Sequence, residues 1–339
     1  MPFGLKNAKA TYQRLVGKVF HNQIGRNLEA YVDDMVIKIT SKEDMLADIK
    51  KILERFRSIN MKLNPKKCSF GIEKGPFLGH LITKQGIRAS HSKVKAITDV
   101  EQPKTLKDIQ SLNGKLAALN RFISKGAKRS LPFFKILKSC TNKKNIRWTQ
   151  EAEAALQEMK KFLEELPTLT TPIHGEVLIM YLSTLTESIS ATLFAKRKEE
   201  QVPIYFVSRV LQGAELNYPA LEKLILALLH AARRLRRYFQ AHTVTVLTNS
   251  PIKQALTKPE KSGRVAKWEI KLGEHDIVFQ KRGDDKKEMS KYFLIKVPLE
   301  DSRKEAEGRT DTKSKNTKLS CEWKLYTDGA QALTAQAHD

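Results

Sequence analysis

Two adjacent carboxylates, Asp33 and Asp34, lie between two apolar runs in the stretch NLEAYVDDMVIKIT at residues 27–40. The flanking residues are mostly aliphatic or aromatic, a composition that predicts two short strands. Two strands separated by two acids predict a β-hairpin with the acids at its tip. Asp is common in turns because its side chain makes local hydrogen bonds, so a solvated turn is the simple alternative.

The apolar flanks favour a second interpretation of the pair, which is a metal site. Like charges held this close are best tolerated when a divalent cation neutralises them. Mg²⁺ binds proteins through one or two carboxylates together with phosphate oxygens. Asp33 and Asp34 therefore indicate phosphoryl transfer on a nucleotide or a nucleic acid.

The net charge of the chain favours a polymer of phosphates as partner. The sequence has 61 Lys and Arg against 37 Asp and Glu, a formal charge of +24. A protein this basic is attracted to the phosphate backbone of nucleic acids, and an acidic membrane surface is the alternative partner. No apolar run approaches the roughly 18 residues that span a bilayer, and no signal peptide opens the chain. We therefore expect no membrane partner and a protein of the cytoplasm or nucleus.

Cysteine usage fits that compartment. The 3 cysteines are far apart in the sequence and odd in number. They predict neither a disulfide framework nor a zinc site, and they fit a reducing environment.

Helical and extended patterns alternate in the first half of the chain. An amphipathic helix is expected after residue 41, with its apolar stripe at Leu46, Ile49, Leu53 and Phe56. Short apolar segments at residues 68–72 and 77–83 predict a further hairpin. Residues 105–122 carry a long apolar helical stripe, and another helix is expected from Trp148 to the proline at 167.

The pattern changes after Pro172. Three apolar runs at 177–184, 190–197 and 202–208 are followed by a long helical pattern at 218–239 and a strand at 243–249. This order predicts an α/β domain over residues 173–283. Residues 284–319 are rich in charge and predict a solvated linker, and a last apolar piece begins at about residue 320.

Several of these segments together resemble a known family. MPFGLKNAKATYQRLV at 1–16, YVDD at 31–34, LNPKKCSFG at 63–71 and FLGHLITKQGI at 77–87 are similar to consecutive motifs of the reverse transcriptase of gypsy-type LTR retrotransposons, with plant elements as the best match. Residues 205–242 resemble the RNase H-like domain that follows it in the same Pol polyprotein. YVDD alone would be a weaker signal than the ordered set.

The resemblance implies an α+β fold and a domain order. It implies a partial palm at 1–90, thumb and connection helices at 91–172, and a degenerate RNase H-like domain at 173–283. After the linker at 284–319, WKLYTDGAQ resembles the start of a second RNase H domain, truncated, over residues 320–339.

The resemblance also implies roles for individual residues in RNA-directed DNA synthesis. Asp33 and Asp34 would hold two Mg²⁺ ions that activate the primer 3′ hydroxyl, with Asp33 as the more direct ligand. The implied partners are an RNA template, a DNA primer and their RNA/DNA hybrid. The other implied contacts are with the incoming nucleotide (Phe3, Gly4), the primer terminus (Tyr31, Val32) and the primer strand (Phe77, Leu78, Gly79, His80).

Departures from the family pattern concern both sites. The family's third polymerase aspartate precedes the first residue of this sequence, which implies N-terminal truncation, and Lys9 replaces a usual Gly or Pro. In the RNase H-like part, Ser183 and Asn249 stand where metal-binding acids are expected. Glu222 remains there, and Asp328 has the corresponding place in the truncated second domain.

Two hypotheses of different classes follow. The first is an RNA-directed DNA polymerase with an RNase H-like domain, active in the intact parent polyprotein. The second is a nucleic-acid-binding relic without catalysis, and dimerisation is left open. Either should contact phosphates through basic residues, for which the candidates are Lys66, Lys67, Lys115, Arg121, Arg233, Arg234, Arg236 and Arg237.

Overall fold

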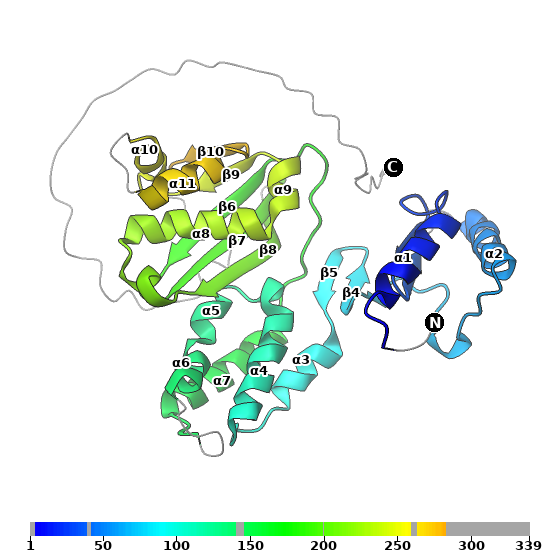
Figure 1. Cartoon of the computed structure of the whole chain (residues 1–339), viewed down its shortest axis with the longest axis horizontal. Coiled ribbons are helices and arrows are strands. Elements are labelled where there is room, and N and C mark those ends of the chain that lie inside the picture. Colours follow the sequence, from blue (N-terminus) through cyan, green and yellow to red (C-terminus); the bar gives the residue numbers. More distant parts are fainter. Residues whose placement is uncertain (1–3, 39–41, 140–145, 199, 259–262, 283–339) are drawn as a thin grey trace, which may run out of the picture.

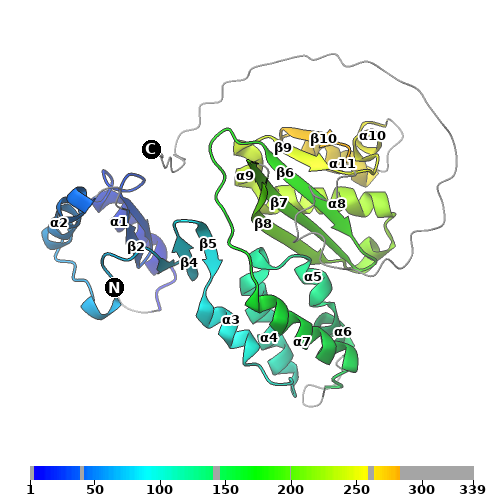
Figure 2. The same cartoon turned by 180° about the vertical axis from the view of Figure 1, so that it is seen from behind.

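The described residues of the computed structural model form three lobes (Figures 1 and 2). They comprise residues 4–38, 42–139, 146–198, 200–258 and 263–282. Each lobe has its own cluster of buried apolar side chains. Of the described helices, none is long and apolar enough to cross a membrane.

The first lobe holds the acidic pair. It contains α1 (Ala8–Val19), β1 (Leu28–Tyr31), β2 (Asp34–Ile37) and α2 (Lys42–Ser58). The hairpin that we predicted from the acidic stretch is confirmed, because β1 and β2 pair antiparallel from Leu28–Ile37 to Tyr31–Asp34. The small core of this lobe joins both helices to the hairpin through Val16, Phe20, Leu28, Ile52 and Phe56.

The predicted stripe of α2 was partly wrong. The helix buries Ile52 and Phe56, which are one helical turn apart, whereas Leu46 is 73% exposed. Among the described residues, the core that α1 and the hairpin form takes in only Ile52 and Phe56 of this helix, so the start of the helix has no apolar partner there.

A short antiparallel sheet follows the first lobe. Its strands are β3 (Gly75–Phe77), β4 (His80–Thr83) and β5 (Gly86–Ala89), in that order. The strand that we expected at 68–72 does not form: residues 65–67 make the short helix η1 (Pro65–Lys67), and Phe70 and Ile72 are 63% and 53% exposed. Without a partner strand, the apolar residues of 68–72 had no ladder to join.

The helical lobe packs around the predicted apolar stripe. Thr105 caps α4 (Leu106–Leu119) in a capping box with Asp108, and Ile109, Leu112, Leu116 and Leu119 are buried. The expected later helix is α7 (Gln150–Glu164), capped by Thr149. The remaining elements are α3 (His91–Thr98), η2 (Asn120–Phe122), α5 (Gly126–Arg129) and α6 (Leu131–Ser139).

The sheet lobe has the strand order β10-β9-β6-β7-β8. The strands are β6 (Leu178–Thr184), β7 (Ser188–Arg197), β8 (Glu200–Val210), β9 (Val244–Leu247) and β10 (Ile277–Gln280). The first three are antiparallel, and β9 and β10 run parallel to β6. The four strands that we predicted are confirmed, and β10 was missed because its four residues give no clear alternation.

Helices cover one face of this sheet, and Figure 2 turns the opposite face to the viewer. The central helix α8 (Ala220–Arg234) ends at Leu235, where the backbone leaves the helical region before α9 (Arg236–Ala241). The single long helix expected at 218–239 is therefore two. The other elements here are η3 (Gly213–Asn217), α10 (Ile252–Thr257) and α11 (Gly263–Leu272).

Hydrogen bonds join the helical and sheet lobes. The hydroxyl of Ser208 on β8 accepts from the backbone N–H of Ala127 at 2.9 Å and donates to Asn120 Oδ1 at 3.4 Å. Phe206 of β8 is buried in the core of the helical lobe. The edge strand β8 therefore belongs to both cores, which fixes the helical lobe against the sheet.

Candidate functional site: the acidic hairpin and its surroundings

The acidic hairpin is closed by a two-residue turn, Val32–Asp33. Asp33 lies in the turn and Asp34 is the first residue of β2, opposite Tyr31. Both carboxylates are exposed, and Tyr31 is 59% exposed. The tip of the hairpin thus presents two acids and one aromatic ring to solvent.

Backbone strain is present at this turn. Val32 has a φ of +53°, a region that β-branched residues rarely adopt. Such conformations cost free energy and persist only where the surroundings hold them.

The side chain of Gln13, on α1, stabilises the turn in this conformation. Its Oε1 accepts a hydrogen bond from the Val32 backbone N–H at 2.6 Å, and its Nε2 donates to the Ala30 carbonyl at 3.2 Å. One amide thus fixes the backbone on both sides of Tyr31. Gln13 could not be predicted from the sequence, because a single polar residue in a helix gives no sign of such a contact.

Two adjacent carboxylates fit the chemistry of a divalent cation. Mg²⁺ often takes one or two carboxylates and completes its shell with water and substrate phosphates. Across the residues that the structure describes, no group of three or more His, Cys, Asp or Glu side chains could hold a metal ion. Asp33 and Asp34 by themselves could therefore supply only part of a ligand set.

The other expected polymerase residues lie in two places. Gly4 is exposed with a φ of +96°, and Phe3 lies outside the described residues. Leu78 and Gly79 form the turn between β3 and β4, with φ values of +50° and +72°. Positive φ at both positions is typical of a tight hairpin turn, where Gly or Asn is the usual residue. Leu78, 44% exposed, is thus a second strained residue at a hairpin tip.

His80 links this second hairpin to the helical lobe. Its ring lies 5.6 Å from the ring of Phe122, centroid to centroid. Partial burial, with the nearby charges of Arg121 and Lys93, lowers the pKa of His80 below its ordinary value. The imidazole is therefore neutral near pH 7, and its Nδ1 is buried without a hydrogen-bond partner in the described structure.

The expected RNase H-like acids are not brought together. Ser183 on β6 lies opposite Ser190, and Asn249 Oδ1 accepts from the backbone N–H of Arg282 at 3.1 Å. The carboxylate of Glu222 is 2.9 Å from Nε of Arg264 on α11. Glu222 on α8 is thus paired with Arg264. Asp328 lies outside the described residues.

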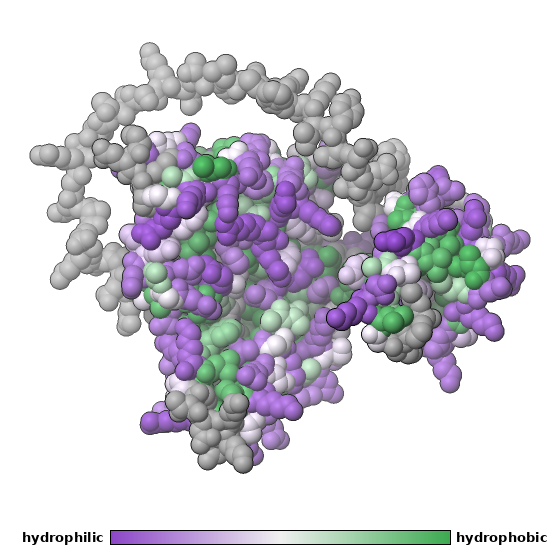
Figure 3. Space-filling model, viewed as in Figure 1, coloured by the Kyte–Doolittle hydropathy of each residue, from purple (hydrophilic) through white to green (hydrophobic). Residues whose placement is uncertain are grey.

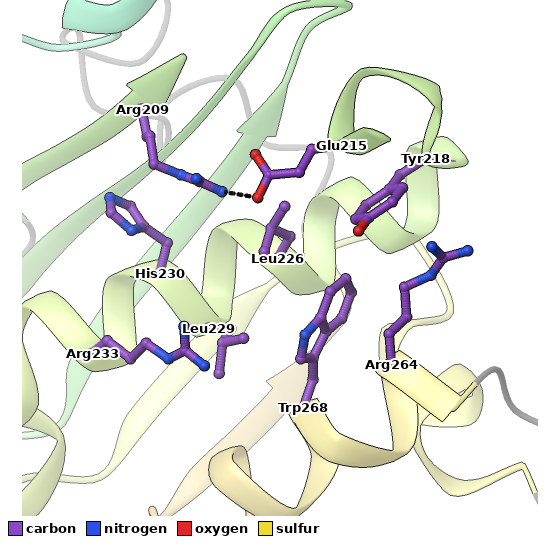
Figure 4. Close-up of a pocket in the computed structure, with 9 residues that line it drawn as sticks. All are labelled: Arg209, Glu215, Tyr218, Leu226, Leu229, His230, Arg233, Arg264 and Trp268. Atoms are coloured by element: carbon purple, nitrogen blue, oxygen red, sulfur yellow. Dashed lines mark hydrogen bonds and ion pairs between the residues drawn. The ribbon is translucent and has the colours of Figure 1, made fainter. Parts of the chain in front are cut away.

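A cavity of about 290 Å³ lies beside that ion pair, between η3, α8 and α11 (Figure 4). Arg209 donates to Glu215 across it at 2.8 Å, and Arg264 lies over the ring of Tyr218 at 4.3 Å. Burial and the charges of Arg209, Arg234 and Arg233 lower the pKa of His230 to about 4.

Two segments of the chain match known protein families. Residues 1–82 match the family described as reverse transcriptase (RNA-dependent DNA polymerase), and residues 148–246 match the RNase H-like domain found in reverse transcriptase. The chain carries a reverse transcriptase region and an RNase H-like domain. The acidic hairpin lies inside the first match, and β6, β7, β8 and α8 lie inside the second.

Curated relatives are retrotransposon polyproteins. The retrovirus-related Pol polyprotein from transposon 297 of Drosophila melanogaster is 30% identical over 280 residues, which are 82% of this chain and 26% of that protein. The gypsy Pol polyprotein of the same fly is 25% identical over 302 residues, 84% of this chain and 28% of that protein. The chain thus spans about a quarter of the length of the relatives it matches.

Solved structures share the fold. A foamy viral protease-reverse transcriptase in complex with an RNA/DNA hybrid matches with a TM-score of 0.72 and 21% identity, over 91% of this chain and 42% of that one. The same enzyme in complex with dsDNA matches with a TM-score of 0.72 and 23% identity, over 84% of this chain and 60% of that one. The α+β architecture that we expected is confirmed.

Proposed function

We propose that this chain is a segment of the Pol polyprotein of a gypsy-type LTR retrotransposon, a plant element by its motifs, and that it serves RNA-directed DNA synthesis inside the cell. The acidic hairpin carries the proposal. Asp33 lies there on an exposed turn whose backbone is hydrogen-bonded to Gln13 of α1, within the segment that matches reverse transcriptase.

In this proposal the partners are an RNA template, a DNA primer and the hybrid that they form. The +24 charge of the chain supports a polyanionic partner. The related foamy viral structures, which were solved with dsDNA and with an RNA/DNA hybrid, support the same class.

Each part of the hairpin has a proposed task. Asp33 and Asp34 would hold Mg²⁺, which when bound supplies positive charge to the reacting phosphate and lowers the pKa of the attacking hydroxyl. Tyr31, exposed beside them, offers an aromatic surface for the primer terminus. Gln13 fixes the turn so that these groups hold their positions as the substrate binds.

Polymerisation by two metals needs one more carboxylate than the hairpin provides. We therefore expect a polypeptide of these 339 residues to be silent in primer extension with Mg²⁺ or Mn²⁺. Activity should appear when a preceding segment of a related polyprotein, carrying a palm strand with an aspartate, is fused ahead of residue 1.

The test is primer extension by the two proteins, each with and without Asp33→Asn. The substitution should remove essentially all activity of the fusion, since Asp34 and the added aspartate are then one carboxylate short of the set that two metals need. Glu73→Gln, an exposed acid of the same lobe, is the control and should retain activity. A fusion whose activity survives Asp33→Asn would reject the proposed site.

A further inference from the structure

A second cavity lies where three parts of the chain meet, and we call it the junction groove. It has a volume of about 420 Å³ and is lined by β4, the end of α4 with η2, strand β8 and helix α8. It adjoins the cavity of Figure 4, with which it shares Arg209 and His230.

The side chains of the junction groove carry positive charge that is only partly compensated by an acid. Its polar lining includes three arginines and two histidines, and no Asp or Glu lines it; the basic residues are His80, Arg121, Arg209, His230 and Arg234. Arg209 is paired with Glu215 at 2.8 Å. Within the described part of the chain, Arg121 and Arg234 have no carboxylate partner.

Arg121 is held in place although it has no ionic partner. Its guanidinium carbon lies 4.8 Å from the ring centroid of Tyr205 and 5.7 Å from that of Phe122. Its Nε is buried and makes no hydrogen bond in the described structure. The positive charge of this guanidinium, at the wall of the cavity and without a carboxylate partner among the described residues, remains free to attract an anionic group that binds there.

Burial is the main cause of the lowered pKa of both histidines, and nearby arginine charge adds to it. Arg121 contributes to the lowered pKa of His80, and Arg209 and Arg234 contribute to that of His230. Because both rings are neutral near pH 7, their polar atoms remain available as hydrogen-bonding groups beside the arginines.

We propose that the junction groove binds the sugar–phosphate backbone of a nucleic acid duplex, with Arg121 and Arg234 as the phosphate contacts. Arginine guanidinium groups suit phosphate oxygens in charge and geometry. The groove runs between the second hairpin and the RNase H-like domain, so one strand bound there would contact both parts. This inference rests on the proposed function and extends it to a defined site.

The direct test is the salt dependence of hybrid binding by the full chain. A fluorescent RNA/DNA hybrid is titrated at several salt concentrations with wild type and with the double variant Arg121→Gln/Arg234→Gln. Each lost phosphate contact should lower the slope of log affinity against log salt by about one, so we expect a decrease of about two. The affinity should fall alike for two unrelated sequences, because phosphates carry no sequence.

Two further variants separate charge from packing and from position. Arg121→Lys/Arg234→Lys keeps both charges and should keep the wild-type slope. Lys253→Gln removes one charge from an exposed position on α10 that lines neither cavity, and it should leave the slope within about half a unit of wild type. Thermal unfolding of each variant establishes that it folds.

Three results would overturn the inference. One is an unchanged slope in the glutamine double variant while wild type binds tightly, which would leave the proposed function standing. Another is an equal loss of slope in the lysine variant, since packing would then explain it. The third is displacement of the hybrid by ATP at a micromolar concentration, which would assign the groove to a free nucleotide. Failure of wild type to bind any nucleic acid would reject the proposed function itself.

Discussion

Gln13 and Val32 are joined by a hydrogen bond of 2.6 Å that runs from the Val32 backbone N–H to the Gln13 side chain. The Nε2 group of the same Gln13 amide donates to the Ala30 carbonyl oxygen. A helix residue nineteen positions earlier in the chain thus fixes the backbone on both sides of the hairpin's aromatic residue.

We expect Gln13→Ala to destabilise the first lobe by about 1–2 kcal/mol, because it removes two hydrogen bonds and leaves a strained turn unsupported. Gln13→Glu should be harmful too, since a carboxylate cannot donate to the Ala30 carbonyl. Gln110→Ala, an exposed change on α4, is the control. Urea unfolding measures all three, and equal stability of Gln13→Ala and wild type would contradict the bracing role.

A second prediction concerns Leu78, whose φ of +50° is rare for a leucine. Leu78→Asn should stabilise the chain by about 0.5–1 kcal/mol, because Asn tolerates this conformation better. Leu63→Asn is a matched control: Leu63 is 41% exposed, against 44% for Leu78, and does not have a positive φ. If both variants lose stability equally in thermal unfolding, strain at Leu78 is not the cause.

Sequence periodicity predicted the elements that bury an apolar face of their own. The stripe of α4 and the strands β6, β7 and β8 were predicted because helical spacing or a continuous apolar run over many residues directly reflects burial. The prediction was wrong at residues 68–72, where five apolar or small residues suggested a strand. A strand forms only when it pairs with another strand, and the local sequence does not show which segment of the chain will pair with it.

The candidate site shows the same limit. Asp33 and Asp34 could be placed on a hairpin because the acids and their flanks are contiguous. Gln13 and the Glu222–Arg264 pair could not, since each contact joins residues far apart in the chain. The junction groove is the extreme case: Arg121 and Arg234 were separate candidates in the sequence, and only the packing of β8 against the helical lobe brings them to one cavity.

A third prediction concerns Glu222, which pairs with Arg264 at 2.9 Å. We expect the RNase H-like domain not to cleave RNA in an RNA/DNA hybrid with Mg²⁺, because Ser183 and Asn249 stand where the family resemblance leads us to expect metal-binding acids. Glu222→Gln should instead cost about 1 kcal/mol of stability through the partly buried ion pair.

Hybrid cleavage assays and urea unfolding of wild type and Glu222→Gln test both halves of that prediction. Glu269→Gln on α11 gives a comparison at another acid of the same lobe. Detection of Mg²⁺-dependent cleavage that Glu222→Gln abolishes would show that the metal-binding acids lie elsewhere than we placed them.

The last prediction is a loss of stability in mild acid, caused by His230. Its pKa of about 4 in the folded chain lies below the ordinary value of 6.5. Between these two pH values the unfolded chain binds a proton that the folded chain does not, so the free energy of unfolding falls as the pH drops. The full stability contribution is present above about pH 6.5 and is lost by about pH 4. It amounts to about 3 kcal/mol at most, since solvent screens part of the shift.

Urea unfolding at several pH values compares wild type with His230→Gln and with His174→Gln, an exposed control. His230→Gln should flatten the decline between pH 6.5 and 4 and His174→Gln should leave it in place; an equally steep decline in His230→Gln would assign the acid sensitivity to other groups.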